Sequence, residues 1–339
     1  MNQNRRHFLQ LSGLLGLGAV SVGALAHVQN TESVRLSRAE FKVSKTRLAL
    51  GTFVDITAIH ESRDQAEDAI GAAFVELDRI ASLMTRFGNQ SPICELNANA
   101  HLEHTPSEID EILARSFYFY RDTNGAFDIT VKPVIDLFEK RFSAGQKPSD
   151  AELNETLSLV GTQKIQIQNG GLAFADSRMG ITLDGVAPGF IADKISEFLT
   201  RHGVSNHLVN AGGEIRVSGN ALEGKAWNVA IQDPSKKGQY PGVLAMHNGA
   251  VSTSGNYEIF YGEDKMFHHI VDAKTGRSPQ LATSVTVTAP TATDADILST
   301  AVFVMDPQEG LDYINARDGY ECLIIDRDGR QWKSSHWNA

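Results

Sequence analysis

Residues 284–305, near the C-terminal end, limit the possible folds more than any other stretch. They indicate a strand followed closely by a helix. Residues 284–290 (Ser-Val-Thr-Val-Thr-Ala-Pro) have the β-branched content of a strand, and the segment that follows runs from Asp294 into an apolar stretch ending at Met305. Asp296 and Thr300 are four residues apart, which on a helix places both side-chain oxygens on one face. A carboxylate and a hydroxyl, completed by backbone carbonyls, water and substrate phosphates, suit Mg²⁺. The alternative is that Asp294 and Asp296 cap the helix while Thr300 only packs.

The composition limits the kinds of molecule that the protein can bind. The chain has 339 residues, of which 42% are hydrophobic, and can bury a full core. Its formal charge of −10, with scattered Lys and Arg, argues against nucleic acid or an anionic membrane surface as the main partner. An anionic nucleotide could bind where a metal and backbone amides supply positive potential. Cys94 and Cys322 allow one disulfide but do not imply a disulfide framework.

The N-terminus has the features of a targeting segment. Arg5 and Arg6 precede an apolar run that ends in small residues at Ala26, which predicts a twin-arginine signal peptide over residues 1–26. We therefore expect recognition by the twin-arginine export machinery and a periplasmic location. No cysteine follows the apolar run, so a lipoprotein anchor is not expected. The alternative is that the same run is retained as a membrane anchor.

The remaining chain is expected to be one α+β domain. Residues 27–40 are polar and predict a flexible segment, and residues 41–339 mix strands and helices without strict βαβ alternation and without a linker. The expected helices include one from Pro106, capped by Thr105, and one from about Ile191 to His202.

Several predicted strand ends combine glycine with a short polar residue, as at Asp184-Gly185 and Ser254-Gly255. One such pair is ordinary turn chemistry, but many suit a large phosphate-bearing ligand that the backbone approaches closely. His268 and His269 are consecutive, so on a strand at most one faces a site, and the alternative is a surface histidine beside a structural one. The motifs of zinc hydrolases, serine hydrolases and P-loop enzymes are missing.

Taken together, these residues resemble the FAD:protein FMN transferase family, the ApbE-type flavin transferases. The resemblance runs from about Leu48 to Met305, and its blocks come in family order. These blocks are Leu50-Gly51-Thr52, Met84-Thr85-Arg86-Phe87, Gly125-Ala126-Phe127-Asp128, Leu183 to Gly189, Val209 to Ile215, Val251 to Gly255, His269 to Asp272 with Thr275-Gly276-Arg277, and Ala295-Asp296 to Thr300.

The resemblance implies that the chain has an ApbE-like fold and transfers the FMN moiety of FAD to a threonine of an acceptor protein, with release of AMP. It implies that Asp296, Thr300 and the backbone carbonyl of Gly185 bind Mg²⁺, which bridges the pyrophosphate oxygens. His269 matches the histidine that helps to deprotonate the acceptor threonine. The positions that resemble FAD contacts are Leu50, Phe87, Ala126, Phe127, Asp128, Thr182, Pro188, Ser254, Gly255 and Ile270.

The chain departs from the family pattern at three of these positions. Leu50 stands where methionine is common, Thr182 where an acid is usual and Pro188 where a lysine is usual, which leaves the FAD contacts of Thr182 and Pro188 open. One hypothesis is that Asp184 restores the carboxylate. The variant turn and the twin-arginine signal also resemble the subgroup linked to nitrous-oxide reductase maturation. Two other functions remain open: a metal-dependent FAD pyrophosphatase, and an exported flavin-binding protein without turnover.

Overall fold

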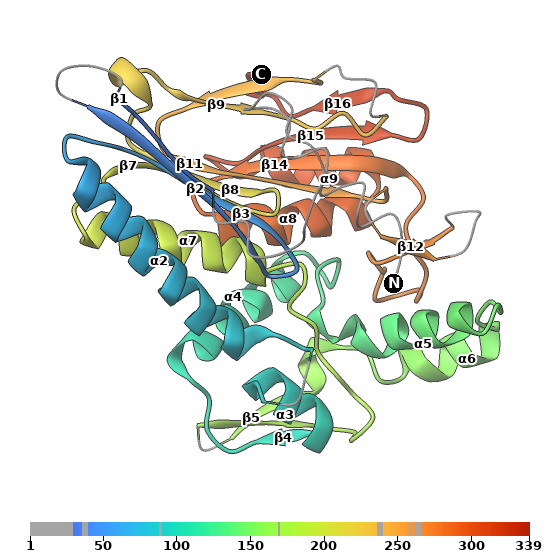
Figure 1. The fold of residues 1–339 in the computed structure, drawn as a ribbon. Helices are drawn as coiled ribbons and strands as arrows, with labels where there is room; N and C mark the ends of the chain where they lie inside the picture. Colours follow the sequence, from blue (N-terminus) through green and yellow to red (C-terminus); the bar gives the residue numbers. More distant parts are fainter. Residues whose placement is uncertain are drawn as a thin grey trace.

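The computed structural model describes residues 30–35, 40–87, 90–168, 170–235, 240–257, 259–261 and 266–339. A nine-stranded sheet in the order β1-β2-β3-β7-β8-β11-β14-β15-β16 forms its centre, and neighbouring strands are antiparallel (Figure 1). The strands are β1 Asn30–Arg35, β2 Phe41–Ala49, β3 Thr52–His60, β7 Asn206–Ala211, β8 Glu214–Ser218, β11 Gly249–Gly255, β14 Ala282–Ala289, β15 Glu321–Asp326 and β16 Gln331–Lys333.

Shorter strands pair outside this sheet. They form a three-stranded sheet and two hairpin-like pairs. The three-stranded sheet contains β4 His101–Leu102, β6 Gly171–Phe174 and β5 Ile165–Gln168, and the pairs are β9 Trp227–Ala230 with β10 Val243–Met246 and β12 Phe260–Tyr261 with β13 Phe267–His268.

The helices lie between and beside these strands. The α-helices are α2 Arg63–Met84, α3 Pro92–Asn99, α4 Ser107–Asp122, α5 Lys132–Ser143, α6 Asp150–Leu157, α7 Ala187–Arg201, α8 Ala292–Val304 and α9 Pro307–Asn315. Short 3₁₀ turns are η1 Ile129–Val131, η2 Thr162–Lys164 and η3 Leu222–Gly224.

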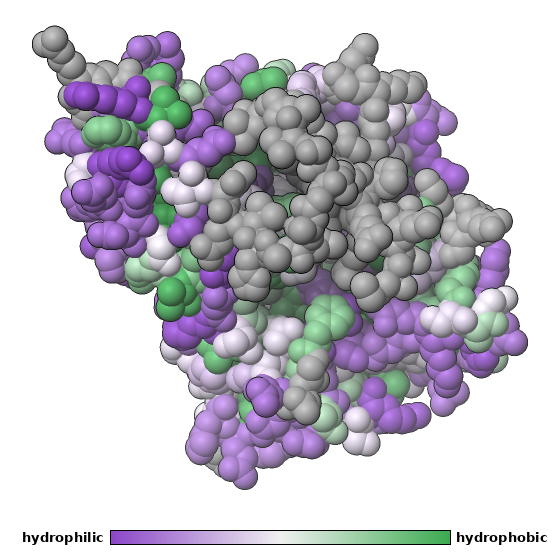
Figure 2. All heavy atoms as spheres, viewed as in Figure 1, coloured by the Kyte–Doolittle hydropathy of each residue, from purple (hydrophilic) through white to green (hydrophobic). Residues whose placement is uncertain are grey.

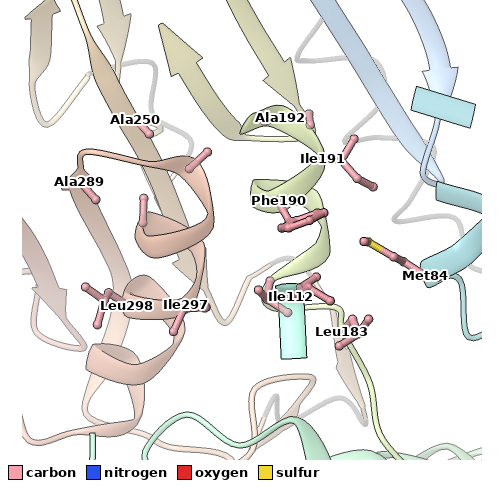
Figure 3. Packing of buried hydrophobic residues seen from close by; sticks show 14 of the residues in the cluster. Met84, Ile112, Leu183, Phe190, Ile191, Ala192, Ala250, Ala289, Ile297 and Leu298 are labelled. Carbon is pink, nitrogen blue, oxygen red and sulfur yellow. The ribbon is translucent and has the colours of Figure 1, made fainter. Parts of the chain in front are cut away.

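Three of the helices, α2, α7 and α8, cover one face of the large sheet (Figure 1). The helix α2 is amphipathic: its buried side includes Ile70 and Leu77, whereas Asp64 and Asp68 are exposed. The surface at the left of Figure 2, where Figure 1 places α2, is largely hydrophilic. The helix α8 is buried on almost all sides, because it packs against β11, β14, α7 and α9. Figure 3 shows apolar side chains of α7 and α8, among them Phe190, Ile297 and Leu298, within this layer.

The opposite face of the sheet is covered by the β9–β10 pair. Trp227 and Leu244 from this pair form a second apolar cluster with sheet residues that include Val251. Ala250, the residue before Val251, belongs to the cluster beneath the helices. The alternation of side chains along β11 therefore assigns even-numbered residues to the face that α8 covers.

The α+β fold class is confirmed, and several local expectations need correction. Within the segment 27–40, residues 30–35 form an edge strand that pairs with β2, and the flexibility of the segment stays a prediction. Thr105 does not cap α4, since Pro106 occupies that position and the helix begins at Ser107. Helix α7 begins earlier than expected, at Ala187, because Pro188 fits the first turn of a helix. The predicted signal peptide lies outside the described residues.

Two further expectations concern disulfides and the membrane. Cys94 and Cys322 are both free, so the disulfide that the composition allows is not formed. In the described part of the chain, no helix combines the length and hydropathy required to cross a bilayer.

Candidate functional site

The site is built where the start of α7 meets the middle of α8. The backbone N–H of Gly189 donates a hydrogen bond of 3.0 Å to Oδ2 of Asp296. A Cβ atom at Gly189 would lie 2.4 Å from the carbonyl oxygen of Ala292 and 2.8 Å from Cβ of Asp296, so only glycine permits this approach. One carboxylate oxygen of Asp296 is thereby fixed by the backbone of α7.

The three residues predicted to bind Mg²⁺ are brought together. Asp296 and Thr300 lie on the same face of α8, as their spacing predicts. Gly185, in the turn before α7, lies against Thr300: a Cβ atom at Gly185 would be 3.2 Å from Thr300 Oγ1 and 3.6 Å from the ring of Phe127. A carboxylate and a hydroxyl from one sequence block and a peptide from another therefore border one space, and all three contain oxygen.

The electrostatics of this space favour a cation. Asp296 is buried, and the loss of hydration raises its pKa well above the ordinary value. The negative charges of Glu214, Asp184 and Asp193 raise this pKa further, whereas the hydrogen bond from Gly189 lowers it. A divalent ion would compensate this concentration of negative charge. Within the described ranges, no group of three His, Cys, Asp or Glu side chains could hold a metal ion. The set formed by Asp296, Thr300 and Gly185 contains one carboxylate.

His269 is near enough to Asp184, the residue before Gly185, for the charge of Asp184 to act on its ring, and it is suited to accept a proton. Its Nδ1 is 3.1 Å from the carbonyl oxygen of Ile259; because a carbonyl only accepts, Nδ1 carries the hydrogen and Nε2 is the basic nitrogen. Burial lowers the pKa of His269 below its usual value, although the carboxylate of Asp184 opposes this shift. His269 is therefore neutral near pH 7.

His268, in contrast, is structural. Its Nε2 lies 2.9 Å from the carbonyl oxygen of Pro279, and its fully buried ring meets Phe303 edge-on with 5.6 Å between ring centroids. Of the two consecutive histidines, only His269 is left as a candidate for the site. His269 lies just after β13, so strand alternation does not decide between them.

Comparison with known proteins assigns the family. The model of the ApbE family matches residues 50–324. The chain belongs to the ApbE family. It is 33% identical to a protein of Haemophilus influenzae over 80% of this chain and 81% of that protein, and 30% identical to one of Treponema pallidum over 85% of each; both are named FAD:protein FMN transferase. The crystal structure of the ApbE protein from Thermotoga maritima has a TM-score of 0.78 and 26% identity, covering 90% of this chain and 97% of that chain.

The ApbE-type fold expected from the motifs is therefore confirmed, and the positions predicted to contact flavin can be located in it. Phe127 packs at Gly185, and Pro188 directly precedes Gly189. Ser254 Oγ lies 3.2 Å from Thr300 Oγ1. These three positions surround the turn and the start of α7.

Phe87 is connected to the same turn through Arg86. The guanidinium of Arg86 donates a hydrogen bond of 2.9 Å to Asp184 and lies 4.4 Å from the ring centroid of Phe87. The ring of Phe87 is 63% exposed, which leaves it free to contact a flat ligand. The carboxylate of Asp184, the residue proposed to replace the missing acid, is thus held by Arg86.

Asp128 and Thr182 make mostly internal contacts in this structure. Asp128 Oδ1 accepts hydrogen bonds from the backbone and hydroxyl of Thr130 and from the hydroxyl of Thr162, and burial raises its pKa. Thr182 donates its N–H to Ile129 and accepts a hydrogen bond from the N–H of Asp184, which shapes the turn. The FAD contacts of both side chains remain predictions.

The other predicted FAD contacts lie on separate elements. Leu50 is at the tip of the β2–β3 hairpin with a φ of 55° and is 36% exposed. Gly255 ends β11, where a Cβ atom would lie 2.4 Å from the ring of Tyr257. Ala126 and Ile270 are buried.

Two residues that were not identified from the sequence hold the segments of the site in place. Asp193 on α7 accepts hydrogen bonds of 2.8 Å from the N–H groups of both Ala292 and Thr293, the first residues of α8. Asn97 exchanges two hydrogen bonds with the backbone of Ile181, of 2.7 and 2.9 Å, and so holds the segment that leads into the turn. This segment is irregular and not the strand that the sequence predicts. Sequence spacing gives no signal for either contact, because both join distant segments.

The alternative in which Asp294 caps α8 is wrong. Thr291 occupies the cap position, and its hydroxyl accepts a hydrogen bond from the N–H of Asp294. The carboxylate of Asp294 instead forms two hydrogen bonds of 2.6 Å with Arg115 and accepts one from Tyr320. The buried charge of Asp294 is thus paired with an arginine, which fixes α8 to α4.

Proposed function

We propose that this chain transfers the FMN moiety of FAD to a threonine hydroxyl of an acceptor protein and releases AMP, in an Mg²⁺-dependent reaction. Membership of the ApbE family and the name shared by the Haemophilus influenzae and Treponema pallidum relatives support this activity. The observation that carries it is the meeting of Asp296, Thr300 and Gly185 in one acidic, oxygen-lined space.

In this proposal Asp296, Thr300 and the carbonyl of Gly185 hold Mg²⁺. When bound, the ion neutralises charge on the pyrophosphate of FAD and on the departing AMP. Asp296 would ionise in its presence, because the positive charge offsets the burial and the neighbouring acids that raise its pKa. The hydrogen bond from Gly189 keeps the Asp296 side chain in one orientation.

His269 would accept the hydroxyl proton of the acceptor threonine at Nε2. The threonine oxygen then forms a bond to the phosphorus of the FMN moiety as the bond from that phosphorus to the AMP oxygen breaks. The contact between Nδ1 and Ile259 orients the ring, and the lowered pKa keeps Nε2 unprotonated at neutral pH. The exposed ring of Phe87, held beside the turn through Arg86, would contact the flavin.

The proposal extends to the location of the protein. The paired arginines and the apolar run over residues 1–26 favour export by the twin-arginine machinery to the periplasm. The variant turn with Thr182 and Pro188 favours an acceptor in nitrous-oxide reductase maturation. Fractionation of cells that express the chain with Arg5 and Arg6 either intact or changed to Lys tests the export route, since only the intact pair should deliver protein to the periplasm.

The activity is tested by incubating the protein with FAD, Mg²⁺ and a candidate acceptor, and by measuring AMP release and the mass of the acceptor. Transfer predicts one AMP per acceptor and a mass gain equal to one FMN less water. AMP and free FMN without a modified acceptor would indicate a pyrophosphatase. Retention of FAD without AMP would indicate a flavin-binding protein.

A further inference from the structure

A row of hydroxyl groups connects β11 to the predicted metal position. Because side chains alternate along a strand, Ser252 and Ser254 point to the face of the sheet that α8 covers. Ser254 Oγ lies 2.8 Å from Ser299 Oγ and 3.2 Å from Thr300 Oγ1. Ser252 Oγ lies 3.2 Å from Ser299 Oγ. Ser254 therefore contacts both Ser299 and Thr300, whereas Ser252 contacts Ser299 but has no hydrogen bond to Thr300.

One contact fixes the direction of these hydrogen bonds. Ser299 Oγ is 3.0 Å from the backbone carbonyl oxygen of Asp296, and because a carbonyl only accepts, Ser299 donates its single hydrogen there. Ser299 then has only lone pairs to offer Ser254, so Ser254 donates to Ser299. The lone pairs of Ser254 in turn accept the hydrogen of Thr300.

These hydrogen bonds determine the orientation of the Thr300 hydroxyl. Its hydrogen points toward Ser254, so its remaining lone pair is available on the side where Gly185 approaches its hydroxyl. A hydroxyl binds a cation through a lone pair and is repelled if its hydrogen points at the ion. Ser299 is completely buried, and its hydroxyl hydrogen is held by the helix itself, so water does not compete for it.

We propose that Ser299 is a positioning residue of the metal site, which acts through Ser254 to present the lone pair of Thr300 to the ion. The proposal rests on the proposed function, because it requires Thr300 to be a metal ligand. Without the Ser299 hydroxyl, Ser254 is free to donate to Thr300 instead. The hydrogen of Thr300 then turns toward the ion and weakens binding.

Metal binding tests the proposal without reference to turnover. Mn²⁺, which shares the preference of Mg²⁺ for oxygen ligands, is titrated into the full chain, and the free ion is measured by electron paramagnetic resonance. We expect Ser299→Ala to weaken Mn²⁺ binding about tenfold, as is typical when a partner of a metal ligand is lost. Ser252→Ala is the matched control: it removes a buried hydroxyl bonded to the same Ser299 but off the path to Thr300, and it should leave the affinity unchanged.

A double-mutant cycle identifies the route. In a Thr300→Val background, which lacks the receiving hydroxyl, Ser299→Ala should cause no further loss of affinity. An equal loss in both backgrounds would overturn the proposal, as would unchanged binding in Ser299→Ala. If that variant does not fold, Ser299→Cys serves in its place, because it nearly keeps the volume and is only a weak donor. A wild-type chain that binds neither Mn²⁺ nor Mg²⁺ would overturn the metal site as well, whereas normal wild-type binding with an unaffected variant overturns only the role of Ser299.

Discussion

Gly189 and Asp296 are joined by a hydrogen bond from the backbone N–H of Gly189 to the carboxylate of Asp296, which ties the first turn of α7 to α8. A second contact runs in the opposite direction, since Asp193 of α7 accepts hydrogen bonds from the first N–H groups of α8. Each helix thus satisfies free amides at the start of the other. This reciprocal arrangement holds the turn with Gly185 against the face with Thr300, and makes the site part of the helix packing.

Gly189→Ala should disrupt this packing. The new methyl group would lie 2.4 Å from the carbonyl oxygen of Ala292, which is rigid backbone, so α7 and α8 must separate. We expect a loss of about 2 kcal/mol in the free energy of unfolding, typical of overpacking, together with weaker Mg²⁺ binding. Urea unfolding measures the first effect and Mn²⁺ titration the second.

Gly71→Ala is the matched control for this prediction. Gly71 lies within α2, and a Cβ atom there would meet no atom within 4 Å. Alanine should therefore stabilise the protein by about 0.5–1 kcal/mol through helix propensity. Equal effects of the two substitutions would show that the contact between α7 and α8 is not tight.

Asp296→Asn should separate activity from stability. The buried carboxylate has a raised pKa because burial and neighbouring acids oppose its charge, so a neutral amide of similar shape should fold at least as stably. Loss of the ligand should lower flavin transfer by about 100-fold or more, because metal charge stabilisation supplies several kcal/mol. AMP release and thermal unfolding measure the two effects. Mg²⁺-dependent transfer at the wild-type rate would contradict the metal assignment.

The motifs predicted which residues gather, but not how they are held. The spacing of Asp296 and Thr300 was sufficient to place both on one helix face, because that geometry is local. The alternative in which Asp294 caps α8 fails because its carboxylate is bound by Arg115, a residue 179 positions earlier in the chain. Asp193 was not identified because its role depends on how α7 crosses the start of α8. Tertiary contacts of this kind leave no periodic pattern in the sequence.

His269→Ala should slow flavin transfer more than it weakens FAD binding. With Nδ1 bonded to Ile259, Nε2 is the proton acceptor, and burial lowers the pKa of the ring below 6.5. The wild-type rate should therefore fall in acid as His269 becomes protonated, with the fall beginning at a lower pH than for an ordinary histidine. We expect a decrease of about 100-fold in the transfer rate of the variant at pH 7 and loss of this acid limb.

The control for His269 is His247→Ala, a substitution at an exposed histidine that contacts Asn220. It should retain both the rate and the pH profile. Stopped-flow or quenched measurements of acceptor modification give the rate, and flavin fluorescence gives FAD affinity. Equal losses of rate and affinity in His269→Ala would assign the residue to ligand positioning.

His207 should make the fold sensitive to acid. Its ring is fully buried between Ser196, 2.7 Å from Nε2, and the carbonyl of Val204, 2.9 Å from Nδ1, and burial lowers its pKa to about 4. Well above pH 7 the ring is neutral in both the folded and the unfolded chain, so it contributes no pH dependence there. As the pH falls below about 6.5 the unfolded chain binds a proton that the folded chain does not, which destabilises the fold by about 1.4 kcal/mol per pH unit until about pH 4.

Between pH 7 and pH 5, His207→Gln should therefore lose about 2 kcal/mol less stability than the wild type in urea unfolding, while the exposed His202→Gln should behave as wild type. The same loss of stability in His207→Gln and in the wild type would show that His207 does not titrate differently in the folded and unfolded states.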